Sequence, residues 1–122
     1  MADEKTEGVG VRYDQGKIRV ELVPPELVIA FAEVAAAGAK KYPERNWELG
    51  MKRSRVYASL VRHLLKWWSG QDTDAETGCR HLDMVVWNVG VLATYNRRGV
   101  GEDDRPRTPG CTGWLEKEEV RE

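Results

Sequence analysis

The fold class of this chain follows from Ser54-Arg-Val-Tyr-Ala-Ser-Leu-Val-Arg-His-Leu-Leu-Lys-Trp-Trp-Ser-Gly70. Apolar side chains recur there every three or four positions, at Val56, Leu60, Leu64 and Trp67. This spacing is typical of an amphipathic α-helix, in which about 3.6 residues make one turn. Ser54 is a good N-cap, and Gly70 suits the position after a helix C-terminus. The sequence therefore predicts a helix from Arg55 to about Ser69.

A helix is also expected before this segment. Pro25 suits a first helical turn, and Pro43 disfavours the helical conformation at the residue before it. These signals predict a helix from Pro25 to about Lys41. Its apolar stripe is expected to consist of Leu27, Phe31, Val34 and Gly38.

A third helix is expected after the acidic loop. It begins near residues 77–80 and reaches about Asn96, where Arg97 and Arg98 suit the negative end of the helix dipole. With the two segments before it, this gives an all-α protein, a helical bundle of three main helices. An extended N-terminal lead-in precedes them and a partly irregular C-terminal tail follows.

The length of 122 residues suits one domain. We expect residues 1–7 to be a flexible N-terminus, residues 8–99 a helical domain, and residues 100–122 a tail. Asp14-Gln-Gly16 marks a turn in the lead-in, either inside an extended segment or in a small hairpin. Three helices of this length cannot bury five tryptophans, which favours a homo-oligomer.

Composition excludes several classes of protein. Hydrophobic residues make up 41% of the chain and charged residues 32%, which is too apolar for a disordered chain. No segment approaches the roughly 20 apolar residues of a membrane span, and the first residues lack the apolar core of a signal peptide. Cys79 and Cys111 form neither a disulfide framework nor a CxxC zinc motif. A cytoplasmic protein is expected.

The charge distribution points to a small anionic ligand. The net charge of −1 argues against a stable nucleic-acid complex, yet eight bases and only two acids lie between Lys40 and Lys66. The alternative is a solvated helix face.

The candidate substrate-binding residues include the segment that joins the first two helices. Lys40, Lys41 and Arg45 could neutralise phosphates, Tyr42 or Trp47 could stack on a base, and Asn46 could supply an amide. The alternative is a helix C-terminus with its usual cations and a tryptophan that anchors the loop. The remaining candidates are Arg62, Lys66 and Asn88.

Candidate catalytic residues are His63, His81 and Asp83. A histidine there could position phosphate or water, although a histidine on an apolar face is more often a satisfied core residue. His81 and Asn88 are seven positions apart and share a helix face, so a mutual hydrogen bond is the plainer alternative to a polar cavity.

The acidic loop offers a possible metal site. Asp72, Asp74 and Glu76 could converge on Mg²⁺ or Mn²⁺. They could equally stabilise the N-terminus of the following helix. Glu33, the one charge in the apolar run of the first helix, is either a metal ligand or a residue of the outer face, and the outer face is favoured. No nucleophile elbow, phosphate-binding glycine loop or catalytic triad is present. Attack of water on a phosphate is therefore the catalytic chemistry considered.

An ordered series of motifs resembles one phage-associated family. They are Arg12-Tyr-Asp-Gln-Gly-Lys17, Leu22-Val-Pro-Pro-Glu26, Gly38-Ala-Lys-Lys-Tyr42, Arg45-Asn-Trp-Glu-Leu-Gly50, Arg62-His-Leu-Leu-Lys-Trp67, Gly70-Gln-Asp-Thr-Asp-Ala-Glu-Thr-Gly78, His81-Leu and Trp87-Asn88. The series, over about residues 8–97, resembles the domain at the N-terminus of phage dATP/dGTP diphosphohydrolases, which also occurs alone. The resemblance implies hydrolysis of a purine deoxynucleoside triphosphate to monophosphate and pyrophosphate.

That activity is best understood in MazG-like all-α pyrophosphohydrolases, where paired carboxylates on two helices hold Mg²⁺. This sequence departs from their pattern. Arg62-His-Leu-Leu-Lys66 and Arg80-His-Leu-Asp83 stand where the acidic helices would be, and only Asp83 fits. The hypotheses are therefore a purine nucleotide pyrophosphohydrolase of the host cytoplasm, a phage protein that sequesters a nucleotide without cleaving it, and an interaction protein that uses Trp114 and the tail.

Overall fold

In the computed structural model, residues 8–108, 113 and 115 are described. Three α-helices and two short 3₁₀-helices make up the regular structure of this part, and no β-strand occurs among these residues. The all-α prediction is confirmed. Cys111 and Trp114 lie outside the described residues, as do residues 1–7 and most of the tail.

Helix α1 (Pro25–Lys41) has the bounds that its prolines predict. The amide of Tyr42 donates to the carbonyl of Gly38 at 2.8 Å and closes the last turn. The buried face consists of Ala30 and Val34. The predicted apolar stripe is therefore correct at Val34. It is wrong at Leu27 and Phe31, which are 41% and 37% exposed.

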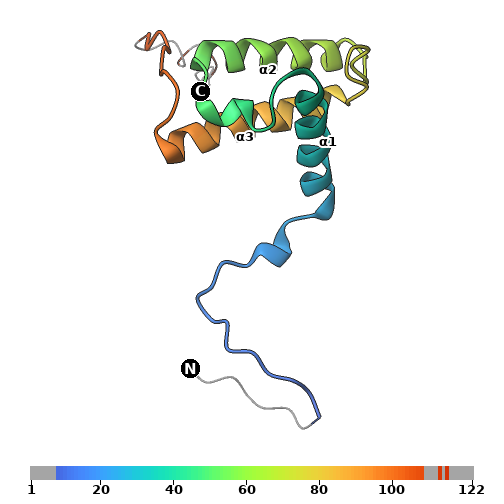
Figure 1. The fold of residues 1–122 in the computed structure, drawn as a ribbon, viewed down its shortest axis with the longest axis vertical. Coiled ribbons are helices and arrows are strands. Elements are labelled where there is room, and N and C mark those ends of the chain that lie inside the picture. The colour runs from blue at the N-terminus through green and yellow to red at the C-terminus, as the bar shows by residue number, and fades with distance from the viewer. Residues whose placement is uncertain (1–7, 109–112, 114, 116–122) are drawn as a thin grey trace, which may run out of the picture.

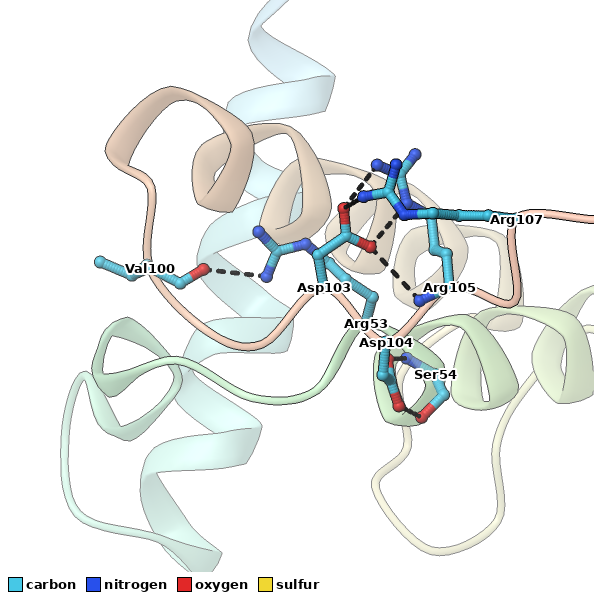
Figure 2. A network of polar contacts seen from close by, with 7 residues as sticks. All are labelled: Arg53, Ser54, Val100, Asp103, Asp104, Arg105 and Arg107. Carbon is cyan, nitrogen blue, oxygen red and sulfur yellow. Dashed lines mark hydrogen bonds and ion pairs between the residues drawn. The ribbon is translucent and has the colours of Figure 1, made fainter.

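Helix α2 (Arg53–Trp68) begins two residues before the predicted start. Ser54 is not its N-cap, because Lys52 occupies that position and has no capping side chain. The carboxylate of Asp104 instead accepts a hydrogen bond from the amide of Ser54 at 2.8 Å and another from the Ser54 hydroxyl (Figure 2). The amide of Arg53 donates to the carbonyl of Glu102 at 3.0 Å. The segment after helix α3 (His81–Arg98) thus completes the first turn of α2.

Arg53 fastens the same segment from inside the bundle. Its side chain is only 8% exposed, donates to the carbonyl of Val100 at 2.8 Å and lies 5.1 Å from the centre of the Tyr95 ring. Beside it, the carboxylate of Asp103 pairs with two arginines, at 2.7 Å from Arg105 and 2.6 Å from Arg107 (Figure 2). The charges of Asp103, Arg105 and Arg107 are therefore paired with one another.

Helix α3 (His81–Arg98) begins slightly later than predicted and ends at Gly99, whose φ of 66° is left-handed. The core lies along it, where Val56, Val91 and Tyr95 are buried together. The 3₁₀-helix η2 (Asn46–Leu49) closes this core. The Tyr95 hydroxyl donates to the carbonyl of Trp47 at 2.5 Å.

Helix α3 packs against both α2 and α1. Figure 1 shows α2 and α3 lying side by side, with α1 at one end and the N-terminal lead-in running away from the bundle. The 3₁₀-helix η1 (Val20–Leu22) interrupts this lead-in. No described helix combines the length and apolarity that crossing a membrane requires.

Candidate functional site

A strip of polar side chains lies between α2 and α3. The Nδ1 atoms of His63 and His81 lie 2.9 Å apart, and their ring centres lie 5.1 Å apart. Further along the helices, Asn88 donates to the hydroxyl of Ser59 at 3.3 Å. The mutual bond weighed for His81 and Asn88 is therefore replaced by bonds from each to the facing helix.

Asp74 joins the two histidines from the loop between the helices. Each of His63, Asp74 and His81 offers one nitrogen or oxygen atom that could bind a metal ion, and these three atoms lie within 4.8 Å of one another. His81 is 1% exposed and Asp74 is 8% exposed, whereas His63 is half-buried. We call these three residues the His–Asp cluster.

Hydrogen bonds within the loop hold Asp74 in place. The amide and hydroxyl of Thr77 both donate to Oδ2 of Asp74, at 3.0 and 2.7 Å. The backbone amide of Asp74 donates to the carbonyl of Cys79 at 2.8 Å. The amide of Gly78 donates to the carbonyl of Asp74 at 2.8 Å, and Gly78 has a φ of 75° that favours glycine. The loop is a tight hairpin that turns the Asp74 side chain inward.

The same hairpin fixes the start of α3. The amide of His81 donates to the carbonyl of Asp72 at 2.8 Å, and Thr73 forms an isolated antiparallel bridge with Arg80. His81 is therefore held at its backbone and its side chain is buried, so its orientation is well defined.

The environment sets the protonation of the cluster. Burial lowers the pKa of His63, and the neighbouring His81, Lys66 and Arg62 lower it further. Burial would raise the pKa of Asp74, but the hydrogen bonds from Thr77 outweigh it and the pKa is lowered. At neutral pH the cluster thus presents a carboxylate beside a neutral imidazole. These are the forms in which aspartate and histidine bind metal ions.

The acidic loop does not bring its own three carboxylates together. Glu76 is exposed and its carboxylate pairs with Lys41 at 3.2 Å, which raises the pKa of Lys41. Neither Glu76 nor Asp72 belongs to the group of converging ligand atoms found in the described part of the chain. Of the three acids, only Asp74 has a geometry suited to a shared metal ion, and its companions are histidines.

Asp83 lies apart from the cluster. It lines a shallow hollow of about 220 Å³ between α1 and α3, together with Glu26, Glu33 and Arg80. Glu33 is exposed, as the favoured sequence interpretation predicts.

The basic segment is largely at the surface. Lys40 is exposed, and Arg45 pairs at 3.3 Å with Glu48, whose pKa is lowered chiefly by a hydrogen bond from Arg98. Tyr42 is 51% exposed and its ring lies 5.5 Å from the Lys41 ammonium. These side chains remain accessible to an anion.

Two other candidates of this segment are held in the fold. Asn46 is partly buried at the start of η2. Trp47 packs edge-on against Trp87, with ring centres 5.2 Å apart, and stacks on Tyr95 at 6.3 Å. Trp47 therefore anchors the loop, which is the alternative to base stacking that the sequence left open.

Arg62 and Lys66 are exposed on α2 on either side of His63 in the sequence. Sequence reasoning missed Ser59 and Thr77, which hold the site together by hydrogen bonds. It grouped Asp74 with Asp72 and Glu76, whereas the ligand atom of Asp74 lies near those of His63 and His81. The one available signal was the Asp-x-x-Thr spacing, which is typical of a side chain that bonds the amide three residues later.

Comparison with known proteins identifies a matching family model and a matching relative. A family model described as "dATP/dGTP diphosphohydrolase, N-terminal" matches residues 7–105. A "dATP/dGTP diphosphohydrolase" of Salmonella phage PMBT28 is 38% identical over 97 residues, which cover 79% of this chain and 33% of the relative. The chain thus spans about a third of the length of that relative. No solved structure matches the chain significantly.

Proposed function

The chain belongs to the dATP/dGTP diphosphohydrolase N-terminal family, and on this basis we propose that it hydrolyses dATP or dGTP to monophosphate and pyrophosphate. In this reaction the oxygen of water bonds to the α-phosphorus. The bond from that phosphorus to the α–β bridging oxygen breaks, pyrophosphate leaves with the electron pair, and water loses a proton. The proposal rests on a relative that carries this name.

The His–Asp cluster offers residues for this chemistry, because it gathers ionisable side chains, two of them buried, in the described chain. His63 and His81 would position phosphate or the attacking water. Arg62 and Lys66 lie beside His63 on the exposed side of α2 and would neutralise phosphate oxygens. A bound divalent cation, Mg²⁺ or Mn²⁺ on the sequence interpretation, would supply charge neutralisation for the triphosphate.

The basic segment before α2 would extend this anion-binding surface. Lys40 and Arg45 are exposed, and Lys41 borders the acidic loop through its ion pair with Glu76. The net charge of −1 argues against a stable complex with nucleic acid. The expected ligand is therefore a free nucleotide in the host cytoplasm.

Pyrophosphate release tests the proposal. The full chain is assayed with dATP, dGTP, dCTP and dTTP in the presence of Mg²⁺ or Mn²⁺. We expect turnover of the purine nucleotides that is lost in His63→Gln and kept in Tyr57→Phe, a matched change at a side chain of α2 that is 63% exposed. Absence of pyrophosphate from all four nucleotides would refute catalysis.

One observation favours the alternative of nucleotide binding without cleavage. The matching region makes up a third of the relative. The hydrolytic activity for which the relative is named could therefore reside in the other two thirds. Calorimetric titration with dGTP, followed by mass spectrometry of the recovered ligand, separates the two functions. Saturable binding with intact dGTP supports a sequestering protein, and recovery of dGMP supports the enzyme.

Self-association is part of the same proposal. Large apolar side chains are exposed on two helices, at 59% for Val28 and 55% for Ile29 on α1. On α2, Leu65 is 61% exposed and Trp68 is 78% exposed. A second copy of the chain would cover these surfaces.

A further inference from the structure

Three potential ligands converge on one point from three separate elements. His63 comes from the middle of α2, Asp74 from the hairpin and His81 from the first position of α3. Two of the three are nearly inaccessible to solvent. Convergence of this kind requires the tertiary fold, because the residues span 18 positions of the chain.

We propose that His63, Asp74 and His81 bind one divalent ion of the first transition series, such as Zn²⁺, Co²⁺, Fe²⁺ or Mn²⁺. The site is distinct from the carboxylate cage for Mg²⁺ that the acidic loop suggests. It uses one carboxylate of that loop and replaces the other two with imidazoles.

The spacing of the two imidazoles fits an ion bound between them. Nitrogen and oxygen ligands lie about 2.0–2.2 Å from such ions, so neighbouring ligands of one ion lie roughly 2.9–3.5 Å apart. The Nδ1 atoms of His63 and His81 are 2.9 Å apart, at the near end of this range. Without an ion, one Nδ1 must keep a proton and donate it to the other. A metal ion replaces that proton and is bound by both lone pairs.

The ligand types select the class of metal. Mg²⁺ and Ca²⁺ prefer oxygen ligands, whereas imidazole suits zinc, iron, nickel and copper, and the carboxylate beside it also suits manganese. Two histidines and one carboxylate leave coordination positions open for water or a phosphate oxygen. The exposed edge of His63 provides the route by which such a ligand would reach the ion.

The surroundings keep the ligands in place before an ion arrives. Both hydrogen bonds from Thr77 fall on Oδ2 of Asp74, and neither uses Oδ1. The hydroxyl of Thr77 also accepts a hydrogen bond from the amide of Cys79 at 3.1 Å, which holds the Thr77 side chain in place. Hydrogen-bonded partners of this kind orient metal ligands and raise affinity. Asp74 is therefore oriented before an ion binds.

The proposal does not rest on the nucleotide activity, and its test uses no nucleotide. The full chain is freed of metal with a chelator and titrated with Co²⁺, whose visible absorption reports coordination by nitrogen and oxygen ligands. We expect one Co²⁺ per chain, a rise in melting temperature on binding, displacement by Zn²⁺ and no displacement by excess Mg²⁺.

Two variants each remove one ligand. Asp74→Asn retains an acceptor for Thr77, and His63→Gln changes a half-buried residue of α2. Because partners of metal ligands alone are worth about 10–100-fold in affinity, loss of a direct ligand should weaken Co²⁺ binding on the order of 100-fold or more. Circular dichroism of the metal-free variants confirms that their helices are intact.

A third variant separates this site from the carboxylate cage. Glu76→Gln removes an acid of the same loop that lies outside the cluster, and Glu44→Gln is a charge-matched control on an exposed residue. Unchanged Co²⁺ affinity in both variants supports the proposal. Failure of the wild-type chain to bind Co²⁺, unchanged binding by Asp74→Asn and His63→Gln, or loss of binding in Glu76→Gln would overturn it.

Discussion

Removal of a single buried oxygen tests how firmly the loop before α2 is held to the core. Tyr95 is fully buried, at 0% exposure, and burial raises the pKa of its hydroxyl. That hydroxyl donates to the carbonyl of Trp47 at 2.5 Å. Tyr95→Phe deletes the bond and leaves the ring, with its contacts to Trp47 and Arg53, in place.

The size of the effect follows from what remains at the carbonyl. The amide of Gly50 also donates to the Trp47 carbonyl, at 3.1 Å, so the acceptor is not left unsatisfied. The penalty of about 1–3 kcal/mol for a buried orphan group therefore does not apply to this carbonyl. The expected cost is that of one ordinary hydrogen bond, about 1 kcal/mol. For a domain of this size, that corresponds to a fall in Tm of roughly 4–8 °C.

Urea and thermal unfolding, followed by circular dichroism, measure this change. Tyr57→Phe is the matched control, because Tyr57 is 63% exposed and should lose less than about 0.5 kcal/mol. Equal stability of the two variants would refute the anchoring role of Tyr95. A loss well above 3 kcal/mol would also refute the reasoning, because it exceeds the cost of even an unsatisfied carbonyl.

Three further predictions concern stability and assembly. Hydrogen bonds from Ser54 lower the pKa of Asp104, so the stability they add is present above the ordinary aspartate pKa of 3.8 and is lost as pH falls through the lowered value. Urea unfolding across this acid range should therefore show a shallower loss in Asp104→Asn, and parallel curves would contradict the cap. Gly101→Ala should lower the free energy of unfolding by roughly 1–3 kcal/mol, because its φ is 77° and the new Cβ would lie 2.6 Å from a backbone oxygen. Thermal unfolding measures this change, and Gly10→Ala is the control because Gly10 has open space around it. Light scattering should give a mass above 13.9 kDa for the wild type and about that mass for Trp68→Ser, and a monomeric wild type would exclude self-association.

The fold was predictable where its signals are local. Pro25 and Pro43 define both ends of α1, and Gly70 and Gly99 mark the ends of the other helices with positive φ values. The start of α2 was wrong by two residues, because Asp104, 50 positions away, binds Ser54. A partner that distant leaves no local trace in the sequence.

The candidate site was predictable in its residue types and not in their grouping. Sequence spacing placed both histidines on helix faces and Asp74 in an acidic loop, but it could not show which faces meet. The 2.9 Å approach of His63 to His81 depends on how α2 packs on α3. The inward turn of Asp74 depends on Thr77 and Gly78 within the hairpin. Both are tertiary properties, so the acids appeared to belong together when they do not.

A crystal of the full chain grown with Mn²⁺ and dGTP, measured at a wavelength where manganese scatters anomalously, tests the central claim most directly. We predict an anomalous peak enclosed by His63, Asp74 and His81, with phosphate oxygens of the nucleotide or its products beside it. An empty cluster, with the phosphates lying instead against Arg12 and Lys17 in the hollow of the N-terminal lead-in, would contradict the account.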